Sequence, residues 1–288
     1  MLKDKINKLT INEGLNKTGI EGVEIFKVST PYKKINSVLP ASICILVQGS
    51  KNLYLGDKKY IYDENSYLIG TVKMPIEAEL IDSSAQNPCL GVIIHLDSNI
   101  ISELLKNFDE LKEWQLDKKT DQIITTSPMN STIENSLERL LDTVINPMDI
   151  KVLSKSFIRE IFYEVLKSKE GHILRNSVQH HTKVHEIVPT IKFLEQNFKN
   201  DISINEISKF ASMSIPSLHK NFKKATSLAP MQFIKQLRLH NAHSLLLSGY
   251  NASNAAFESG YTNSAQFSRE FKRLFGISPK ELKILDTF

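Results

Sequence analysis

The sequence predicts an α+β fold, in which a small antiparallel β-barrel with a helical hairpin precedes an all-α domain built around one long helix. Three observations support this fold. Short runs of alternating apolar and polar residues extend to about residue 95, and apolar residues then recur with helical spacing. Near the C-terminus one sequence pattern occurs twice. The chain has 288 residues, 41% of them hydrophobic and 24% charged, so it can form two ordinary domains.

The predicted barrel begins near Val23 and ends near His95. Its strands are expected in VEIFKVS, ASICILVQ, KNLYLGD, KKYIYDE, SYLIGTVKM, EAELID and CLGVIIHLD, with Gly49, Gly56 and Pro75 among the breaks. Short runs with period-two alternation, separated by turn residues, are typical of a small antiparallel barrel or sandwich. The alternation does not decide whether four tyrosines line a pocket or cover the outer surface: Tyr54, Tyr60, Tyr62 and Tyr67.

Two amphipathic stripes after the barrel predict a helical hairpin. The first stripe comprises Ile133, Leu137, Leu140, Leu141 and Val144, and the second Val152, Leu153, Phe157, Ile161 and Val165. Asn146 and Pro147 separate them, and Asp149 is placed to cap the second helix. These stripes suggest dimerisation, although packing onto the barrel would explain the same pattern.

A polar segment without clear periodicity, residues 171–185, predicts a linker between a first domain, 1–170, and a second, 186–288. Helices are expected over 187–198, 204–211, 230–248, 253–259 and 264–275, with a further helix starting after Ser214. Asp201 or Ser203 is placed to cap the second of these helices, and Gly249 ends the longest.

The repeated pattern lies in this second domain. SLHKNFKKATSLAP, residues 217–230, recurs 49 residues later as QFSREFKRLFGISP, residues 266–279. In each copy two large apolar residues share one helix face, and basic or hydrogen-bonding residues occupy the other. Each copy follows a short helix and a tight turn, so the chain is predicted to carry two helix-turn-helix units.

A helix-turn-helix unit can bind DNA because its second helix fits the major groove. The apolar face packs on the first helix, while the outer face offers hydrogen bonds to base edges and cations to phosphates. The helix from Pro230 to Leu247 would be about 27 Å long at roughly 1.5 Å per residue. With a unit at each end, it approaches the roughly 34 Å that separates successive major-groove openings on one side of a duplex.

These residues carry a family resemblance. The segment from Ser203 to Leu282, through RLHNAHSLL and GYTNSAQFSREFKRLFGISP, resembles the DNA-binding domain of the AraC/XylS family of bacterial transcription regulators. The segment from Thr30 to Leu105, through LVQGSKNLYLGD and YIYDENSYLI, is similar to the cupin-like N-terminal domain of one branch of that family. The resemblance implies a transcription regulator with a β-barrel sensor or interaction domain.

The resemblance also implies which residues contact DNA. Base contacts are expected at Pro216, Ser217, His219, Lys220, Ala265, Gln266, Ser268 and Arg269. Phosphate contacts are expected at Ser214, Lys223, Lys224, Asn263, Lys272 and Arg273. Arg269 is the strongest candidate for a base contact, because a guanidinium can form two hydrogen bonds to guanine.

The first unit departs from the family pattern at its turns. Ser212 and Ser227 stand where glycine is usual, and a left-handed backbone there would cost about 1 kcal/mol. Ser208 replaces the usual alanine at the helix crossing, while Ala252 and Ala255 replace larger aliphatic residues. The first unit is therefore expected to bind DNA more weakly than the second.

The charge distribution fits these partners. Residues 186–288 carry 13 Lys and Arg against 8 Asp and Glu, whereas the preceding residues are close to neutral. Double-stranded DNA is the expected partner, and the resemblance allows RNA polymerase, a small-molecule effector and a second copy of the chain as further partners. No membrane partner is expected, because no apolar run approaches the roughly 20 residues of a membrane span.

Catalytic and metal-binding alternatives receive little support. A metal-dependent barrel enzyme needs two or three histidines in the barrel, but only His95 precedes His172. His172, His180, His181 and His185 are expected to be plain linker residues. Cys44 and Cys89 lie on strands and are expected to be inert thiols in a reducing cytoplasm. We therefore expect no enzyme activity, no metal and no cofactor.

Two alternatives to a sequence-specific regulator stay open. An architectural protein would bend DNA without a preferred site, although it would share the salt dependence that phosphate contacts produce. A protein-interaction adaptor whose helix-turn-helix units no longer bind DNA is supported only by the serines at positions 212 and 227.

Overall fold

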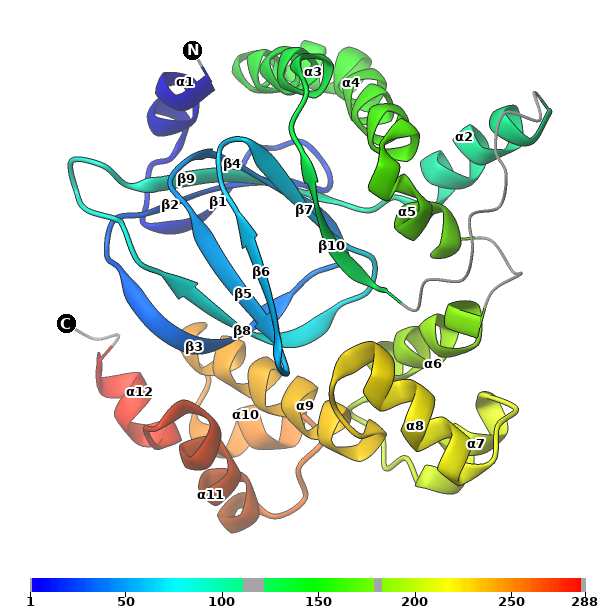
Figure 1. Ribbon diagram of the computed structural model, residues 1–288. Coiled ribbons are helices and arrows are strands. Elements are labelled where there is room, and N and C mark those ends of the chain that lie inside the picture. The colour runs from blue at the N-terminus through cyan, green and yellow to red at the C-terminus, as the bar shows by residue number, and fades with distance from the viewer. Residues whose placement is uncertain (1, 111–121, 179–182, 286–288) are drawn as a thin grey trace.

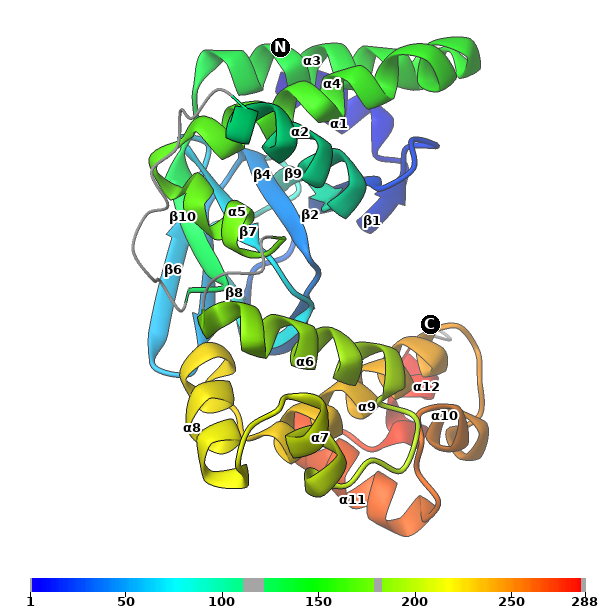
Figure 2. The ribbon, with the colours of Figure 1, turned by 90° about the vertical axis from the view of Figure 1, so that its right-hand side faces the viewer.

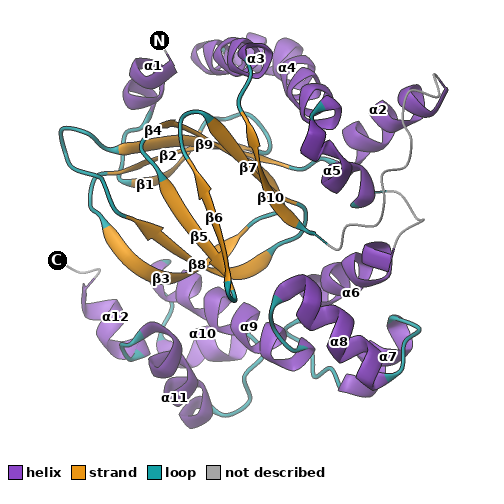
Figure 3. Cartoon of the chain, in the orientation of Figure 1, coloured by secondary structure: helices purple, strands orange, loops and turns teal. Residues whose placement is uncertain are grey.

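The computed structural model describes residues 2–110, 122–178 and 183–285. Two antiparallel sheets form the N-terminal barrel (Figures 1 and 3). One has the strand order β1-β2-β9-β4-β7-β10 and the other β3-β8-β5-β6. The strands are β1 (Gly14–Lys17), β2 (Val23–Val28), β3 (Tyr32–Leu39), β4 (Ser42–Gln48), β5 (Lys51–Leu55), β6 (Lys58–Tyr62), β7 (Ser66–Gly70), β8 (Met74–Leu80), β9 (Cys89–His95) and β10 (Ile124–Pro128).

The centre of the larger sheet explains the most apolar runs of the sequence. Strands β4 and β9 pair with Ile43 opposite Ile94 and Ile45 opposite Val92, and nearly every residue of both strands is buried. One face of this sheet lines the barrel interior and the other is covered by helices, so polar residues have no exposed face to occupy. The α+β class and the antiparallel barrel that the sequence predicts are thereby confirmed.

In the described part of the chain the barrel is accompanied by the α-helices α1 (Leu2–Leu9), α2 (Ser98–Glu110), α3 (Ser131–Asp142), α4 (Pro147–Lys167) and α5 (His172–Asn176). Helices α3 and α4 form the predicted hairpin across one end of the barrel (Figure 2). The predicted cap was wrong: Asn146 caps α4 by accepting the Met148 N–H, and Asp149 lies in the first turn. Proline at the first helical position shifts the start of the helix to residue 147, ahead of Asp149.

The apolar stripe of α4 differs in part from the predicted one. Ile161 and Val165 are buried against the barrel side of the molecule, as predicted. Val152 and Leu153 are exposed instead, because the face of the first two turns that packs on the core runs through Ile150 and Ser154. The buried face continues through Ile158 and Phe162, which the predicted stripe omitted.

The C-terminal helices lie at the opposite end of the barrel from α3 and α4 (Figure 2). They are α6 (Lys183–Asn197), α7 (Ile204–Phe210), α8 (Ile215–Thr226), α9 (Pro230–Leu247), α10 (Ala252–Glu258), α11 (Ser264–Phe275) and α12 (Pro279–Leu285). Ser203 rather than Asp201 caps α7, and its side chain forms a reciprocal capping box with Glu206.

Three apolar clusters form the core. One lies between the larger sheet and helices α1 to α5. A second begins inside the barrel and continues through α6, α8 and the first half of α9. The third is smaller and joins the second half of α9 to α10, α11 and α12. The two helix-turn-helix units therefore belong to different clusters.

Candidate nucleic-acid interface and barrel cavity

The first helix-turn-helix unit consists of α7 and α8. Helix α7 ends in a left-handed residue, Ser212 with φ 51°, after which the Met213 N–H donates to the Ser208 carbonyl at 3.1 Å. Ser214 then caps α8 by accepting the Ser217 N–H. Leu218 and Phe222 are fully buried, so the opposite face of α8 points outward. The unit has the predicted boundaries and turn.

The second unit repeats this construction in α10 and α11. Gly260 supplies the left-handed residue with φ 85°, and the Tyr261 N–H donates to the Ala256 carbonyl at 3.0 Å. Asn263 caps α11 by accepting the N–H groups of Ala265 and Gln266. A β-carbon at Gly260 would lie 2.5 Å from the Lys199 carbonyl oxygen, so only glycine fits this turn. Phe267 and Phe271 are the buried residues of α11.

The residues predicted to contact DNA lie on the outer faces of α8 and α11 and at their N-termini. All eight expected base-contacting residues and all six expected phosphate-contacting residues are exposed. The side chains of Ser214 and Asn263 also serve as caps, and the Gln266 amide donates to Glu270 at 3.3 Å. The barrel packs on the helices without covering these two faces.

Helix α9 joins the two units and is fixed in place by polar contacts. Arg238 donates to the carbonyls of Phe198 and Asn200 at 2.6 and 2.8 Å, which ties α9 to the end of α6. Lys235 pairs with Glu270 of α11 at 3.1 Å. The ammonium of Lys235 and the hydroxyl of Tyr261 hold the pKa of Glu270 below its usual value, against the opposing effect of burial. These contacts give the second unit a defined orientation on α9.

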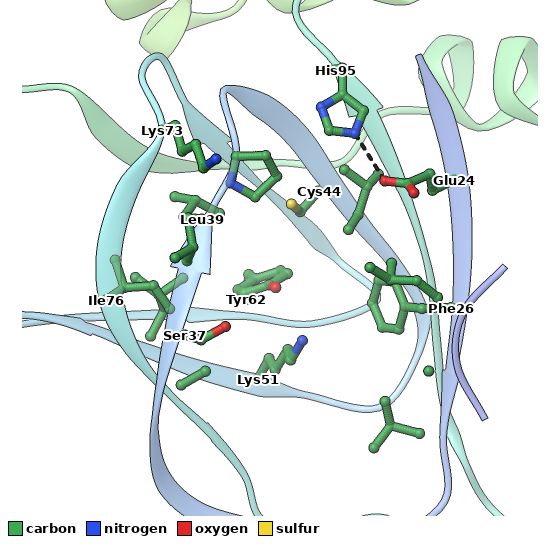
Figure 4. Close-up of a pocket in the computed structure, with 18 of the residues that line it drawn as sticks. Glu24, Phe26, Ser37, Leu39, Cys44, Lys51, Tyr62, Lys73, Ile76 and His95 are labelled. Atoms are coloured by element: carbon green, nitrogen blue, oxygen red, sulfur yellow. Dashed lines mark hydrogen bonds and ion pairs between the residues drawn. The ribbon is translucent and has the colours of Figure 1, made fainter. Parts of the chain in front are cut away.

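A second candidate site is a cavity of about 380 Å³ inside the barrel (Figure 4). Its wall is largely apolar and includes Phe26, Leu39, Leu53, Ile76 and Tyr62. Two cationic residues, Lys51 and Lys73, also line it and lie on different sides of Tyr62. The volume and the apolar wall with a few polar groups are those of a small-molecule site. The sequence did not reveal this site, although it left open that a tyrosine such as Tyr62 lines a pocket.

The polar groups of the cavity have identifiable partners. The Lys51 ammonium lies 4.8 Å from the centre of the Phe26 ring. His95, the single histidine of the barrel, contacts the Glu24 carboxylate at 3.0 Å near one side of the cavity. The backbone N–H of Lys73 donates to Glu195 of α6, but burial dominates and raises the pKa of that carboxyl to about 7. Lys73 therefore borders both the cavity and the C-terminal helices.

The other residues considered for chemistry show no site. Cys44 and Cys89 are free and buried, and burial raises the pKa of the Cys89 thiol to about 11. His180 and His181 lie outside the described residues, as does the side chain of His185. Within the described ranges no group of three His, Cys, Asp or Glu residues could hold a metal ion. No helix in these ranges is long and apolar enough to cross a membrane.

Comparison with known families agrees with this architecture. Residues 19–173 match the model of the AraC-type transcriptional regulator N-terminus, which is more than half of the chain. The chain belongs to this family. Residues 207–283 of this AraC-type regulator match a helix-turn-helix domain model, which spans both units described above. It is thus a helix-turn-helix transcription regulator, as the sequence predicts.

Individual relatives extend the comparison over nearly the whole regulator. It is 22% identical over 267 residues to the virulence regulon transcriptional activator VirF of Yersinia enterocolitica, covering 91% of this chain and 96% of VirF. It is 28% identical over 200 residues to the transcriptional activator RhaS of Mannheimia succiniciproducens, covering 69% and 71% of the two chains. Unsaturated-fatty-acid-bound ToxT of Vibrio cholerae has the same fold, with a TM-score of 0.60 and 12% identity over 91% of this chain and 94% of ToxT.

Proposed function

We propose that this regulator binds a specific DNA site by placing α8 and α11 in two adjacent major grooves. In this proposal the eight exposed residues predicted for base contacts select the sequence, and the six predicted for phosphate contacts fix the position of the helices. The observation that carries the proposal is that both second helices are two-sided, with large apolar residues buried and hydrogen-bonding or basic residues exposed. A single such helix is often only a solvated face. Two such helices joined by α9, which is about 27 Å long at roughly 1.5 Å per residue, support binding in two successive grooves roughly 34 Å apart.

The test is selection of bound duplexes from a random DNA pool by the full-length protein. We expect two short enriched blocks about 10 base pairs apart, one for each unit. Arg269→Ala should relax the preference in one block at a cost of about 1–3 kcal/mol, and His219→Ala should relax the other. Lys151→Ala removes an exposed charge from α4, at the far end of the barrel, and is the matched control.

Three outcomes would contradict the proposal in different ways. Salt-sensitive binding without any enriched block would favour the architectural protein. Absence of DNA binding would favour the adaptor. Enrichment of a single block that is lost in Arg269→Ala and unchanged in His219→Ala would show that only the second unit selects bases.

We further propose that the barrel cavity binds a small amphipathic carboxylate as an effector. An apolar wall suits a hydrocarbon chain, and the ammonium groups of Lys51 and Lys73 offer charged hydrogen bonds to a carboxylate. ToxT, which shares the fold, has been solved with an unsaturated fatty acid bound. The residues that line the cavity here offer both features that a fatty acid requires, an apolar wall for the hydrocarbon chain and a cation for the carboxylate.

Titration calorimetry with oleate, kept below its aggregation concentration, tests the effector proposal. Loss of a charged hydrogen bond in Lys51→Gln or Lys73→Gln should weaken binding roughly tenfold. Lys58→Gln, at an exposed position outside the cavity lining, should bind as the wild type does. An uncharged alcohol of equal chain length lacks the carboxylate, so its affinity measures the contribution of the hydrocarbon chain alone. Oleate affinity that survives both cavity substitutions would exclude the lysines as the carboxylate site.

The exposed apolar start of α4 supports a homodimer. Ile145, Met148 and Val152 are exposed together there, which is unusual for a surface without a partner. We propose that a second copy covers them, and that Val152→Glu yields a monomer in sedimentation of the full chain at tens of micromolar, whereas Lys151→Glu does not. A wild-type monomer at that concentration would contradict the dimer.

The remaining expectations complete this proposal. We propose that the protein acts in the cytoplasm without enzymatic activity, and that its domains are a barrel domain, 1–170, a linker, 171–185, and a DNA-binding domain, 186–288. Within the proposed linker, α5 packs with the barrel helices and α6 begins at Lys183. RNA polymerase stays a predicted partner.

A further inference from the structure

The two helix-turn-helix units differ in how they are attached to the barrel. Leu218 and Phe222 of the first unit belong to the apolar cluster that includes Leu53 and Ile76 of the barrel. The corresponding residues of the second unit belong to the separate cluster of α9 to α12. The first unit therefore shares a continuous apolar core with the barrel, to which α6 and α9 also contribute, whereas the second contacts β3 but has a core of its own.

Helix α8 ends at a serine in the left-handed backbone conformation, which serine does not favour. Ser227 has φ 61° and donates its N–H to the Lys223 carbonyl at 2.8 Å. At the corresponding end of α11, Gly276 has φ 79° and donates to Lys272 in the same way. Glycine takes this left-handed conformation without steric cost, and serine does not. The left-handed conformation therefore carries a steric cost at Ser227 that it does not carry at Gly276.

A hydrogen bond to the barrel offsets this cost at Ser227. The Ser227 hydroxyl donates to the carbonyl oxygen of Leu55 at 3.1 Å, at the turn between β5 and β6. The next residue of that turn is Gly56, and a β-carbon there would lie 2.6 Å from the β-carbon of Ser227. A glycine at position 227 would relieve the backbone but would lose this hydrogen bond.

The second recognition helix has a contact at the same end. Asn36 of β3 donates from its amide to the Leu274 carbonyl at 2.6 Å, near the C-terminus of α11. The barrel thus contacts the C-terminal ends of both recognition helices, from β3 and from the β5–β6 turn, and leaves their outer faces exposed. Both contacts lie near the cavity, because Ile76 lines the cavity and also the hollow around Asn36, Leu55 and Ser227.

We propose that Ser227 is a positioning residue for DNA recognition. Its hydrogen bond to the barrel fixes α8, and together with the Asn36 contact to α11 it sets the separation and orientation of the two recognition helices. This inference rests on the proposed function, because it requires a protein that reads two blocks of sequence. Its consequence is that the barrel, rather than α9 alone, determines which spacing of the two blocks binds best.

The test repeats the selection from random DNA with full-length wild type, Ser227→Gly and Ser212→Gly, and compares the spacing between the enriched blocks. Ser212→Gly makes the same exchange at a left-handed residue of the same unit but away from the barrel contact, so it is the matched control. We expect wild type and Ser212→Gly to share one preferred spacing. In Ser227→Gly the preference over neighbouring spacings should fall roughly twofold to tenfold, as loss of one hydrogen bond implies.

Asn36→Ala provides a second variant that acts from the barrel side and should broaden the spacing in the same direction. A merely structural role for Ser227 would change the yield or affinity of the protein without changing the spacing. If Ser227→Gly and Asn36→Ala both keep the wild-type spacing, the positioning role is overturned and two-block recognition stands. If the wild type itself selects no pair of blocks, the proposed function fails instead.

Discussion

The two helix-turn-helix units share a sequence pattern and a construction but not an environment. The first unit packs on the barrel through one continuous apolar cluster, and its left-handed positions carry Ser212 and Ser227. The second has its own small cluster, and its left-handed positions carry Gly260 and Gly276. Repetition of sequence therefore preserves the DNA-facing helix, while the residues around it adapt each unit to a different neighbour.

This difference indicates how an effector signal would travel. A change in the barrel reaches the first unit through shared packing and the Ser227 contact, but reaches the second only through α9 and a few contacts such as that of Asn36. The second unit has the more independent core, and the expectation that the first unit binds DNA more weakly stays a prediction.

Core truncation should separate the two clusters. Phe222→Ala and Phe271→Ala each remove a fully buried ring and should cost about 3–5 kcal/mol locally. Because Phe222 shares its cluster with the barrel, its loss should raise amide hydrogen exchange in β8 as well as in α8. Phe271→Ala should raise exchange only from the second half of α9 onward. Equal opening of β8 in both variants would contradict the division into two clusters.

The pH dependence of stability should reveal the junction near the first unit. Burial raises the pKa of Glu195 to about 7 in the folded protein, whereas its ordinary value is 4.5. The folded state therefore holds this proton more tightly, and its contribution to stability is present below pH 4.5 and is lost as the pH rises through 7. At pH 8, Glu195→Gln should have a free energy of unfolding about 1–3 kcal/mol higher than that of wild type, as measured by urea denaturation. Near pH 4.5 the two proteins should differ little.

A histidine beside the second unit should contribute to stability with the opposite pH dependence. Burial lowers the pKa of His240 to about 4, and its ring lies 5.3 Å from that of Phe275. Its contribution is present above pH 6.5 and is lost as the pH falls through 4. Because wild type and Glu195→Gln both contain His240, this contribution cancels in the difference between them. A difference between wild type and Glu195→Gln that stays constant from pH 5 to 8 would rule out titration of this carboxyl.

The serines at left-handed positions should differ in what they cost. Ser212→Gly relieves an unfavourable φ and should raise the free energy of unfolding by about 0.5–1 kcal/mol, after the greater entropy of an unfolded glycine is deducted. Ser227→Gly should gain less, because it also loses the hydrogen bond to Leu55. Urea unfolding of the two variants measures this, and an equal gain would indicate that the Leu55 contact contributes nothing.

The smallest expected effect is on the salt dependence of DNA binding. Lys223→Ala and Lys272→Ala occupy corresponding positions in the repeat, and each should reduce the slope of log affinity against log salt by about 1 if it contacts a phosphate. Measurement of affinity at several salt concentrations gives the slope. A reduced slope for Lys272→Ala alone would place only α11 against the backbone.

Much of the C-terminal domain could be predicted from the sequence because its signals are local. The helix from Ser264 to Phe275 and the cap at Ser214 follow from periodicity and capping residues that lie within one turn of each other. Strands β1, β3 and β10 were missed, because β1 and β3 are polar or half-exposed and β10 follows a long interval in the chain. The candidate DNA-contacting residues were inferred from the resemblance to the AraC/XylS family, and the structure places them on exposed faces.

The cavity and the barrel contacts could not be predicted in the same way. Lys51 and Lys73 come from different strands and loops, and alternation along a strand does not say which face is the interior. The contact between Ser227 and Leu55 joins residues 172 positions apart, so no local sequence pattern predicts it. The sequence did show an unexpected serine at position 227, and only the structure supplies its partner.

The central claim is that one chain occupies two adjacent major grooves, and hydroxyl-radical footprinting of the full-length protein on its selected site tests it most directly. The account predicts two protected segments about 10 base pairs apart on one face of the duplex, with Arg269→Ala weakening one of them. A single protected segment, unchanged in length when His219 is replaced by alanine, would contradict it.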